Sequence, residues 1–377
     1  MQYLRHINIS DLHIGSQREP SEYSRELIDI IDYIDKVRDE LNVLTLAGDL
    51  FDRVFPANHK AVKMVIDFVQ ALRIRAEAYK FIIFIVKGTE SHDSSQLDIL
   101  KGMEEEGVLY IIKDVSFYEI GGLLFRFIPE YYSKSYDELY QKAFTSKADV
   151  TVYHGAIEGA AFYLKNDLTS QEVNQAQIIR INDLVETTGL YTVCGHIHNR
   201  VNLRKNIWYT GSYTSHSFSD AGSEKGFDDI RIDLETGDYS CKFVRNRKAT
   251  NYMILDATDV FKNSPLSKVK GYFASLKLDT NSSDEIRIDI DANMLTDEEY
   301  KCMETVVSTF KSHFKFNISR QIVQSRSSES IISDAEYVLN PKVSIYEKIK
   351  RIISDEYDYE IEISEIMNLL DIPTNDK

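Results

Sequence analysis

The sequence has 377 residues, of which 43% are hydrophobic, so the chain can bury one large core and still carry smaller modules. Its formal net charge of -16 excludes a generic basic coat for nucleic acid, because non-specific DNA affinity depends on Lys and Arg side chains that neutralise phosphates. The 3 cysteines lack CxxC spacing and no apolar run approaches the length of a membrane span, so we expect a reduced, cytoplasmic protein without membrane association.

Short apolar strands alternate with amphipathic helices in the first part of the chain. Strands are expected at residues 3–9, 43–46 and 81–86, and helices at residues 21–42 and 57–76. This alternation predicts an α/β fold. Beyond Gly88 the pattern loosens and predicts a mixed, layered sheet with a pair of strands at residues 108–112 and 123–128. Later strands are expected at residues 150–153, 191–194, 207–209 and 228–233.

A polar segment, NRKATN at residues 246–251, predicts a boundary between a first domain, residues 1–248, and a small second domain, residues 249–323. The second domain contains a βαβ-like pattern, with a strand at 285–290, a helix at 296–313 and a strand at 315–323. Residues 324–341, which include QSRSSES, are expected to be a linker. Apolar side chains at helical spacing then predict a helical segment at residues 342–377.

Carboxylate and imidazole side chains follow the expected strands at the points where those strands end. Five of the 9 histidines lie in these loops, which read SDLHIG, LAGDLFD, VKGTESHDS, VYHG and VCGHIHN. The residues of interest there are Asp11, His13, Asp49, His92, Asp93, His154, His196 and His198. In open α/β sheets, ligands bind at the carboxyl ends of strands, so we expect these side chains to converge.

Two local features support a metal site in these loops. Asp11 and His13 are two positions apart, and side chains two apart point to the same side of an extended backbone. Gly48 permits close backbone approach beside Asp49, whose carboxylate can bridge two cations. A single DxH or GD pair is common in loops that have no metal site. Chance seldom produces all of these motifs in order, each after a successive strand. Asp and His ligands without Cys suit Mn, Fe or Zn more than Mg or Ca.

The motifs DLHIG, GDLFDR, SHD, HG and GHIH resemble the signatures of the calcineurin-like metallophosphoesterases over about residues 1–245. The segments FIPEYY and WYTGSYTSHSFSD, followed by KGF, resemble the SbcD and meiotic-recombination-eleven nucleases within that superfamily. The resemblance implies a layered α/β/β/α sandwich, a small α+β capping domain and a helical tail. It also implies two divalent cations, with Mn²⁺ expected and Mg²⁺, Fe²⁺ or Zn²⁺ as alternatives.

The resemblance also implies roles for individual residues. Its implied ligands are Asp11, His13 and His198 for the first cation, Asp49 as a bridge, and His154 and His196 for the second. His92 would be the general acid that protonates the leaving oxygen when a hydroxide between the cations attacks phosphorus.

One departure from the family pattern concerns the second cation. The family has GNHD, with the Asn as a ligand, whereas this chain reads GTESHD. Ser91 is the expected substitute, with Glu90 as an alternative. A hydroxyl is a weaker ligand than an amide oxygen, so we expect loose binding and a requirement for added Mn²⁺. The departure resembles variants in viral relatives, so a bacterium or an infected bacterial cell is the expected source.

The expected partners are DNA, an SMC-like ATPase of the SbcC type and a second copy of the chain. The family resemblance implies that residues 342–377 bind the ATPase; packing on the protein's own core is the alternative. The candidate phosphate contacts are Arg200, Arg204, Lys205, Lys242, Arg245, Arg247 and Lys248. Each of them is equally well explained as a solvated surface charge.

The sequence thus favours a two-metal DNA exonuclease or endonuclease subunit for repair and recombination. A phosphatase or phosphodiesterase acting on a small substrate is one alternative, which cleavage of a nitrophenyl ester rather than a DNA hairpin would reveal. The other is a DNA-binding scaffold with weak catalysis, which the intact His92 and GHIH motif disfavour.

Overall fold

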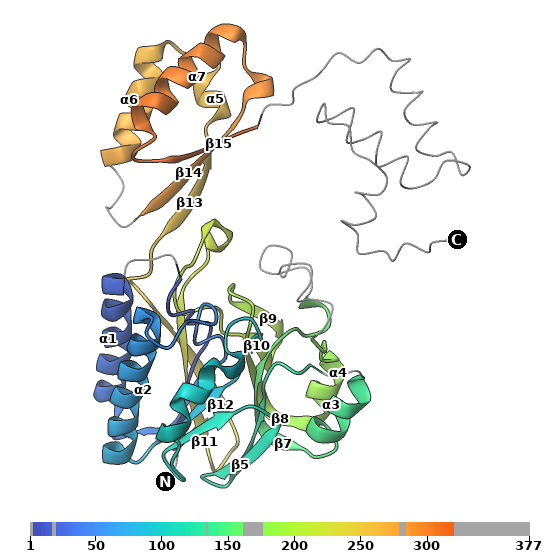
Figure 1. Cartoon of the computed structure of the whole chain (residues 1–377). Coiled ribbons are helices and arrows are strands. Elements are labelled where there is room, and N and C mark those ends of the chain that lie inside the picture. The colour runs from blue at the N-terminus through green and yellow to red at the C-terminus, as the bar shows by residue number, and fades with distance from the viewer. Residues whose placement is uncertain (1–2, 17–19, 133–134, 161–175, 279–283, 320–377) are drawn as a thin grey trace, which may run out of the picture. The chain divides into compact units, whose positions relative to one another are not determined.

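A computed structural model describes residues 3–16, 20–132, 135–160, 176–278 and 284–319. The chain divides into two units, and almost all the described residues belong to the first, which comprises residues 1–290 and 294–318. The predicted α/β class is confirmed, since two six-stranded sheets and one three-stranded sheet combine with helices (Figure 1). No helix within the described ranges is long and apolar enough to cross a membrane.

The first sheet carries the loops of the first three motifs. Its strands are β1 (Tyr3–Ile9), β2 (Leu41–Ala47), β3 (Ile82–Val86), β4 (Leu109–Ile112), β11 (Gly226–Asp233) and β12 (Tyr239–Arg245), in the order β12-β11-β1-β2-β3-β4. The four strands β1 to β4 are parallel, so β1, β2 and β3 end at the same edge. The helices α1 (Pro20–Val37) and α2 (Lys60–Tyr79) share an apolar core with this sheet, and a 3-10 helix, Ser94–Met103, precedes β4.

The second sheet carries the remaining motifs. Its strands are β5 (Ser116–Ile120), β6 (Leu123–Ile128), β7 (Ala148–His154), β8 (Thr188–Gly195), β9 (Val201–Arg204) and β10 (Ile207–Tyr209), in the order β5-β6-β7-β8-β10-β9. The adjacent strands β6, β7 and β8 are parallel. The helices α3 (Tyr136–Ala143) and α4 (Ile181–Thr187) share an apolar core with this sheet.

The two six-stranded sheets pack against each other through a third apolar core. Phe84 of the first sheet and Phe127 of the second stack with ring centroids 4.2 Å apart, and both are fully buried. Figure 1 shows α1 and α2 on one side of the strands and α3 and α4 on the other. The order of layers is therefore helix, sheet, sheet, helix, which brings the carboxyl ends of β1, β2, β3, β7 and β8 together.

Two predictions about elements in the first part of the chain were wrong. Strands β4 and β6 do not pair with each other but lie in different sheets, and β6 pairs with β5, which the sequence analysis missed. Gly121 and Gly122 have φ angles of 61° and 85°, and they form the tight turn that joins β5 to β6. The first helix ends at Val37 rather than at residue 42, because buried Leu41 already pairs with Arg5 of β1.

A small sheet with its own apolar core follows. It consists of β13 (Tyr252–Asp256), β14 (Glu285–Asp291) and β15 (Lys315–Ser319), with the helices α5 (Thr258–Phe261), α6 (Leu266–Leu278) and α7 (Asp297–Phe310). Thr296 and Glu299 form a capping box that begins α7. Short 3-10 helices lie at Phe218–Asp220 and Ala292–Met294. The linker and helical tail expected after residue 323 lie outside the described residues.

Candidate metal centre

The loops that follow β1, β2 and β8 are strained where they carry the motif residues. Asp11, His13, Asp49 and His196 have φ angles of 53°, 42°, 49° and 100°, a region that residues other than Gly seldom adopt. Hydrogen bonds hold these conformations: the backbone N–H of Asp11 donates to Gly48 O (3.1 Å), and that of His13 donates to Asp49 O (2.9 Å). Strain of this kind, of order 1–3 kcal/mol per residue, is typical of functional sites.

The first group of converging side chains is Asp11, His13 and His198, whose potential ligand atoms all lie within 4.8 Å of one another. The Nε2 atoms of His13 and His198 face each other at 3.1 Å. Asp11 is fully buried and accepts the backbone N–H of His196 at 2.9 Å, which fixes its carboxylate in this group. Burial, followed by the neighbouring imidazoles, lowers the pKa of His13, so its ring is neutral and can offer a lone pair.

The second group is Asp49, His154 and His196. His154 Nδ1 donates to Ala47 O at 2.8 Å, so in the neutral ring the lone pair is on Nε2. That Nε2 atom is buried without a hydrogen-bond partner in the described structure, although Asp49 Oδ2 lies 3.3 Å away. A backbone carbonyl that fixes the tautomer while Nε2 points at a carboxylate is the arrangement of a metal-ligating His. The donor set therefore fits a divalent cation.

Asp49 connects the groups. Its Oδ2 atom lies 3.7 Å from His13 Nε2 and 3.3 Å from His154 Nε2, and its side chain is nearly fully buried. Burial raises the pKa of Asp49, but the imidazoles of His154 and His92 outweigh burial and hold it well below its usual value. Burial likewise lowers the pKa of His154, yet Asp49 raises it to about 10. The negative charge that retains a proton on His154 would equally attract a cation in its place.

Three glycines leave room for this arrangement. A Cβ on Gly88 would lie 2.2 Å from both N and Oδ1 of Asp49. A Cβ on Gly48 would lie 2.0 Å from His154 Nδ1, and one on Gly195 would lie 2.2 Å from Ala47 O, the acceptor of that same nitrogen. The glycines before Asp49, before Thr89 and before His196 therefore allow the backbone to approach the ligands closely.

His92 stands beside these groups, with its ring 4.6 Å from that of His13, centroid to centroid. Its Nδ1 atom donates to the carbonyl of Asp52. Burial lowers the pKa of His92, but Asp49 and the Asp52 carbonyl raise it overall. The neighbouring Asp93 is fully buried and accepts the backbone N–H groups of Gly88 and Leu50, so it pins the His92 loop to the Asp49 loop.

Thr89 occupies the place beside Asp49 that was expected for Ser91. Thr89 is buried, and its hydroxyl lies 3.2 Å from Asp49 Oδ2 and 3.5 Å from His196 Nδ1. Ser91 is exposed, and Glu90 is exposed and bonded to Lys87. The structure therefore brings Thr89, and neither of the two residues predicted, into the second group. The feature of the sequence that could have indicated Thr89 is its position directly after Gly88.

Sequence reasoning also missed Glu130 and His216. Glu130 is buried, with Oε1 3.9 Å from His196 Nδ1, and Tyr132 donates to its other oxygen. The His216 ring lies 4.7 Å from that of His13 and 5.2 Å from that of His198. Both residues lie inside segments that resemble the nuclease branch, FIPEYY and GSYTSHSF. The sequence therefore marked these segments, but it did not indicate which side chain in each would lie near the site.

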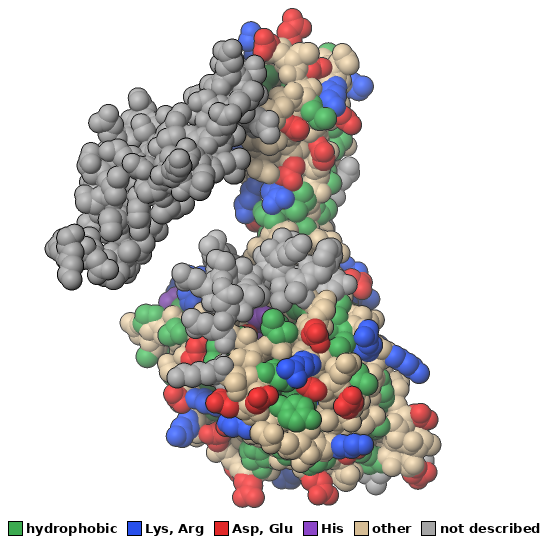
Figure 2. Space-filling view, turned by 90° about the vertical axis from the view of Figure 1, so that its right-hand side faces the viewer, with side chains coloured by type: hydrophobic (Ala, Val, Ile, Leu, Met, Phe, Trp, Pro, Cys, Tyr) green, Lys and Arg blue, Asp and Glu red, His purple; other side chains and the backbone are tan. Residues whose placement is uncertain are grey.

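The seven predicted phosphate contacts fall into two sets, of which one lines a pocket and the other does not. Arg200 donates to buried Asp228 at 2.5 Å and stacks on Phe243, so an internal network engages it. Arg204, Lys205 and Lys242 are exposed in or beside strands β9 and β12. Figure 2 shows acidic and basic side chains interspersed over the face of the first unit that is turned to the viewer. The other three predicted contacts, Arg245, Arg247 and Lys248, line one pocket.

No family model matches the sequence. Among solved structures, a crystal structure of a protein without a stated name is 12% identical with a TM-score of 0.39, over 64% of this chain and 99% of that chain. A protein of unknown function from Aquifex aeolicus is 17% identical with a TM-score of 0.25, over 49% of this chain and 94% of that chain. Both likenesses are weak.

Proposed function

We propose that this protein is a metal-dependent phosphodiesterase that cleaves DNA. The observation that carries the proposal is the convergence of two groups, Asp11/His13/His198 and Asp49/His154/His196, at the shared edge of two sheets. The motif resemblance to the calcineurin-like metallophosphoesterases, in its SbcD and meiotic-recombination-eleven branch, supports the same assignment. The order of layers, with a helix layer on each outer side of two sheets, is the one that this resemblance implies.

Each group would hold one divalent cation, and Asp49 would be shared between them. When bound, two cations would activate water and neutralise the negative charge that develops on the phosphate. Asp11 is held by the backbone N–H of His196, and His154 by the carbonyl of Ala47, so the ligands are positioned before a cation arrives.

His92 would supply the proton for the leaving sugar oxygen. The carbonyl of Asp52 holds Nδ1, which leaves Nε2 to carry the transferred proton. The ring is only half-buried, unlike those of His154 and His196, so a substrate could reach it. General acid catalysis contributes roughly 10²–10⁴-fold to a rate.

A DNA-binding scaffold with weak catalysis is the second candidate. The absence of the family's Asn favours it, because Thr89 offers a hydroxyl where an amide oxygen would bind the second cation more strongly. In the family, the small α+β domain shapes the DNA and an ATPase binds the C-terminal helices. These remain proposals for residues 249–323 and 342–377, as does a homodimer.

The test is cleavage of end-labelled single-stranded, duplex and hairpin DNA with added Mn²⁺, with and without a candidate ATPase partner. Wild type is compared with His92→Ala and with His313→Ala, a matched control because His313 is exposed in the small domain. We expect cleavage by wild type and His313→Ala and loss of at least about 10²-fold in His92→Ala, with Mn²⁺ binding by calorimetry retained. No cleavage by wild type with any divalent metal would favour the scaffold.

A further inference from the structure

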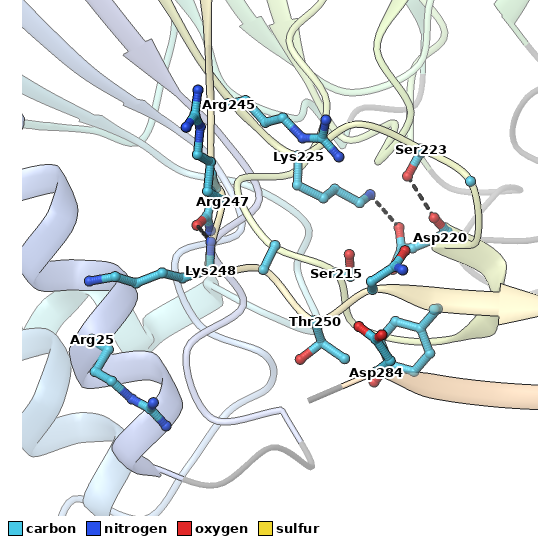
Figure 3. A pocket seen from close by; sticks show the side chains of 15 residues that line it. Arg25, Ser215, Asp220, Ser223, Lys225, Arg245, Arg247, Lys248, Thr250 and Asp284 are labelled. Atoms are coloured by element: carbon cyan, nitrogen blue, oxygen red, sulfur yellow. Dashed lines mark hydrogen bonds and ion pairs between the residues drawn. The ribbon is translucent and has the colours of Figure 1, made fainter. Parts of the chain in front are cut away.

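A pocket of about 680 Å³ lies beside the metal centre and carries an excess of positive charge. The charged side chains of its lining are Arg25, Lys225, Arg245, Arg247 and Lys248, against Asp220 and Asp284. The whole chain is acidic, with a net charge of -16, so this concentration of cations in one recess runs against its composition. Figure 3 shows Arg25 and Lys248 on the α1 side of the pocket and Lys225 in contact with Asp220.

The segment that carries three of these cations is held by buried contacts. Asn246 is 7% exposed, and its side chain donates to Glu26 Oε2 at 2.8 Å and to Tyr213 O at 3.1 Å. Its own Oδ1 accepts the backbone N–H of Lys248 at 2.9 Å. Because Glu26 adjoins Arg25 on α1, one buried amide sets the position of the Arg245–Lys248 segment against the helix that supplies Arg25. The cations are therefore presented by a fixed backbone.

The charges of this segment are available to a ligand. Lys248 pairs with Asp29 at 2.5 Å and Arg245 with Glu224 at 3.6 Å, but all four side chains are at least one-third exposed. Exposed pairs of this kind contribute little, with a median of roughly 0–1 kcal/mol, so a phosphate could replace the carboxylates. Arg247 is exposed and has no acidic partner within 4.0 Å among the residues that the structure describes.

The pocket and the metal centre share a wall. Asp220 lines the pocket, and its Oδ1 atom lies 3.6 Å from His198 Nδ1 in the first group of ligands. Lys225 donates to Asp220 Oδ1 at 2.6 Å and to the carbonyl of His198 at 2.9 Å. Asp220 and Lys225 are both almost fully buried and neutralise each other, which leaves the three arginines and Lys248 against Asp284 alone in the lining.

We propose that this pocket is a second phosphate site. Its side chains Arg25, Arg245, Arg247 and Lys248 bind a phosphate of the nucleic-acid strand other than the phosphate at the bond that is cut. The proposal rests on the proposed function, because it takes the metal centre as the place of cleavage. Arginine side chains bind phosphate oxygens in a planar, bidentate manner, so three arginines and one lysine around one recess can bind the oxygens of a phosphate. A strand held at two points would be oriented for cleavage.

The test measures the affinity of the full-length protein for a labelled single-stranded oligonucleotide, in chelator, by fluorescence anisotropy. The pocket variant is Arg247→Gln with Lys248→Gln. The control is Arg38→Gln with Lys63→Gln, which removes one exposed charge directly after α1 and one on α2. We expect the pocket variant to lose roughly tenfold in affinity. The dependence on salt should also become weaker, with the negative slope of log affinity against log salt shrinking by about 0.7 for each lost contact. The control should match wild type.

Unchanged oligonucleotide affinity in the pocket variant would overturn the proposal. Weaker binding of inorganic phosphate with unchanged binding of the oligonucleotide would also overturn it, because the pocket would then serve a free anion. Hydrolysis of bis(nitrophenyl) phosphate by wild type, measured separately, reports the metal centre. Failure of that reaction would count against the proposed function, whereas the affinity measurement alone decides the pocket.

Discussion

Thr89 donates to both carboxylate oxygens of Asp49: its backbone N–H lies 2.6 Å from Oδ1 and its hydroxyl 3.2 Å from Oδ2. This double contact fixes the carboxylate that lies next to His13 of the first group and His154 of the second. It also places a hydroxyl at the position directly after Gly88, where the resembled family has its Asn. Thr89 is therefore the residue on which the second cation would depend most.

Thr89→Val keeps the shape of the side chain and removes its hydroxyl. We expect the affinity for the second Mn²⁺ to fall by about tenfold, the lower end of what the loss of a supporting hydrogen bond costs a metal site. Thr89→Asn should raise that affinity above wild type. Ser91→Ala is the control, because Ser91 is exposed. Calorimetric titration decides the matter, and a larger effect from Ser91→Ala than from Thr89→Val would contradict the assignment.

Gly88→Ala should abolish binding at the shared carboxylate. The added Cβ would meet N and Oδ1 of Asp49 at 2.2 Å, and neither the backbone nor the pinned carboxylate can move without losing the contact with Thr89. Gly102→Ala is the matched control, since a Cβ there meets nothing within 4 Å. The measurement is the number of Mn²⁺ ions bound per chain after dialysis. Equal metal content in both variants would show that the loop relaxes around the methyl group.

His216→Ala should weaken the first site. The ring packs against both His13 and His198, and its Nε2 atom lies 3.3 Å from the carbonyl of Asp11, so it supports three residues of that group. We expect roughly tenfold weaker binding of the first Mn²⁺, measured by competition with a fluorescent chelator. His313→Ala serves as the control. Wild-type affinity in His216→Ala would assign the residue to packing alone.

His6 should make stability depend on pH. It is fully buried between Tyr191 and Thr45, and burial lowers its pKa from the ordinary value of 6.5 to about 3. Between those two pH values the unfolded chain binds a proton that the folded chain does not, so stability rises with pH. One such group contributes about 1.4 kcal/mol between roughly pH 5.5 and pH 7.5.

The measurement is urea unfolding of wild type and His6→Gln at both pH values, in chelator. Glutamine can keep hydrogen bonds to Tyr191 and Thr45 but does not titrate. The difference in unfolding free energy between the two pH values should therefore be about 1.4 kcal/mol smaller in the variant. All other histidines are common to both proteins, so their contributions cancel. An unchanged pH dependence would mean that His6 is protonated in the folded state.

The sequence by itself determined the α/β class. It also predicted that seven side chains would converge, and they lie together in the structure: Asp11, His13, Asp49, His92, His154, His196 and His198. They meet because each motif directly follows an apolar strand, and strand ends of parallel sheets meet at one edge. That information is local and periodic. The prediction for the end of the first helix was wrong because the pairing of buried Leu41, at the start of β2, outweighed the helical pattern.

Tertiary structure alone decided which of several similar side chains joined the site. Thr89 lies beside Asp49 whereas Ser91 faces solvent, and His216 reaches His13 from a position more than 200 residues away in the chain. The sequence also did not predict the pairing of β6 with β5 or the pocket lined by Arg25 and Lys248. Local pattern reports which face of an element is buried, but the approach of two distant loops depends on how whole layers pack, which no short segment of sequence contains.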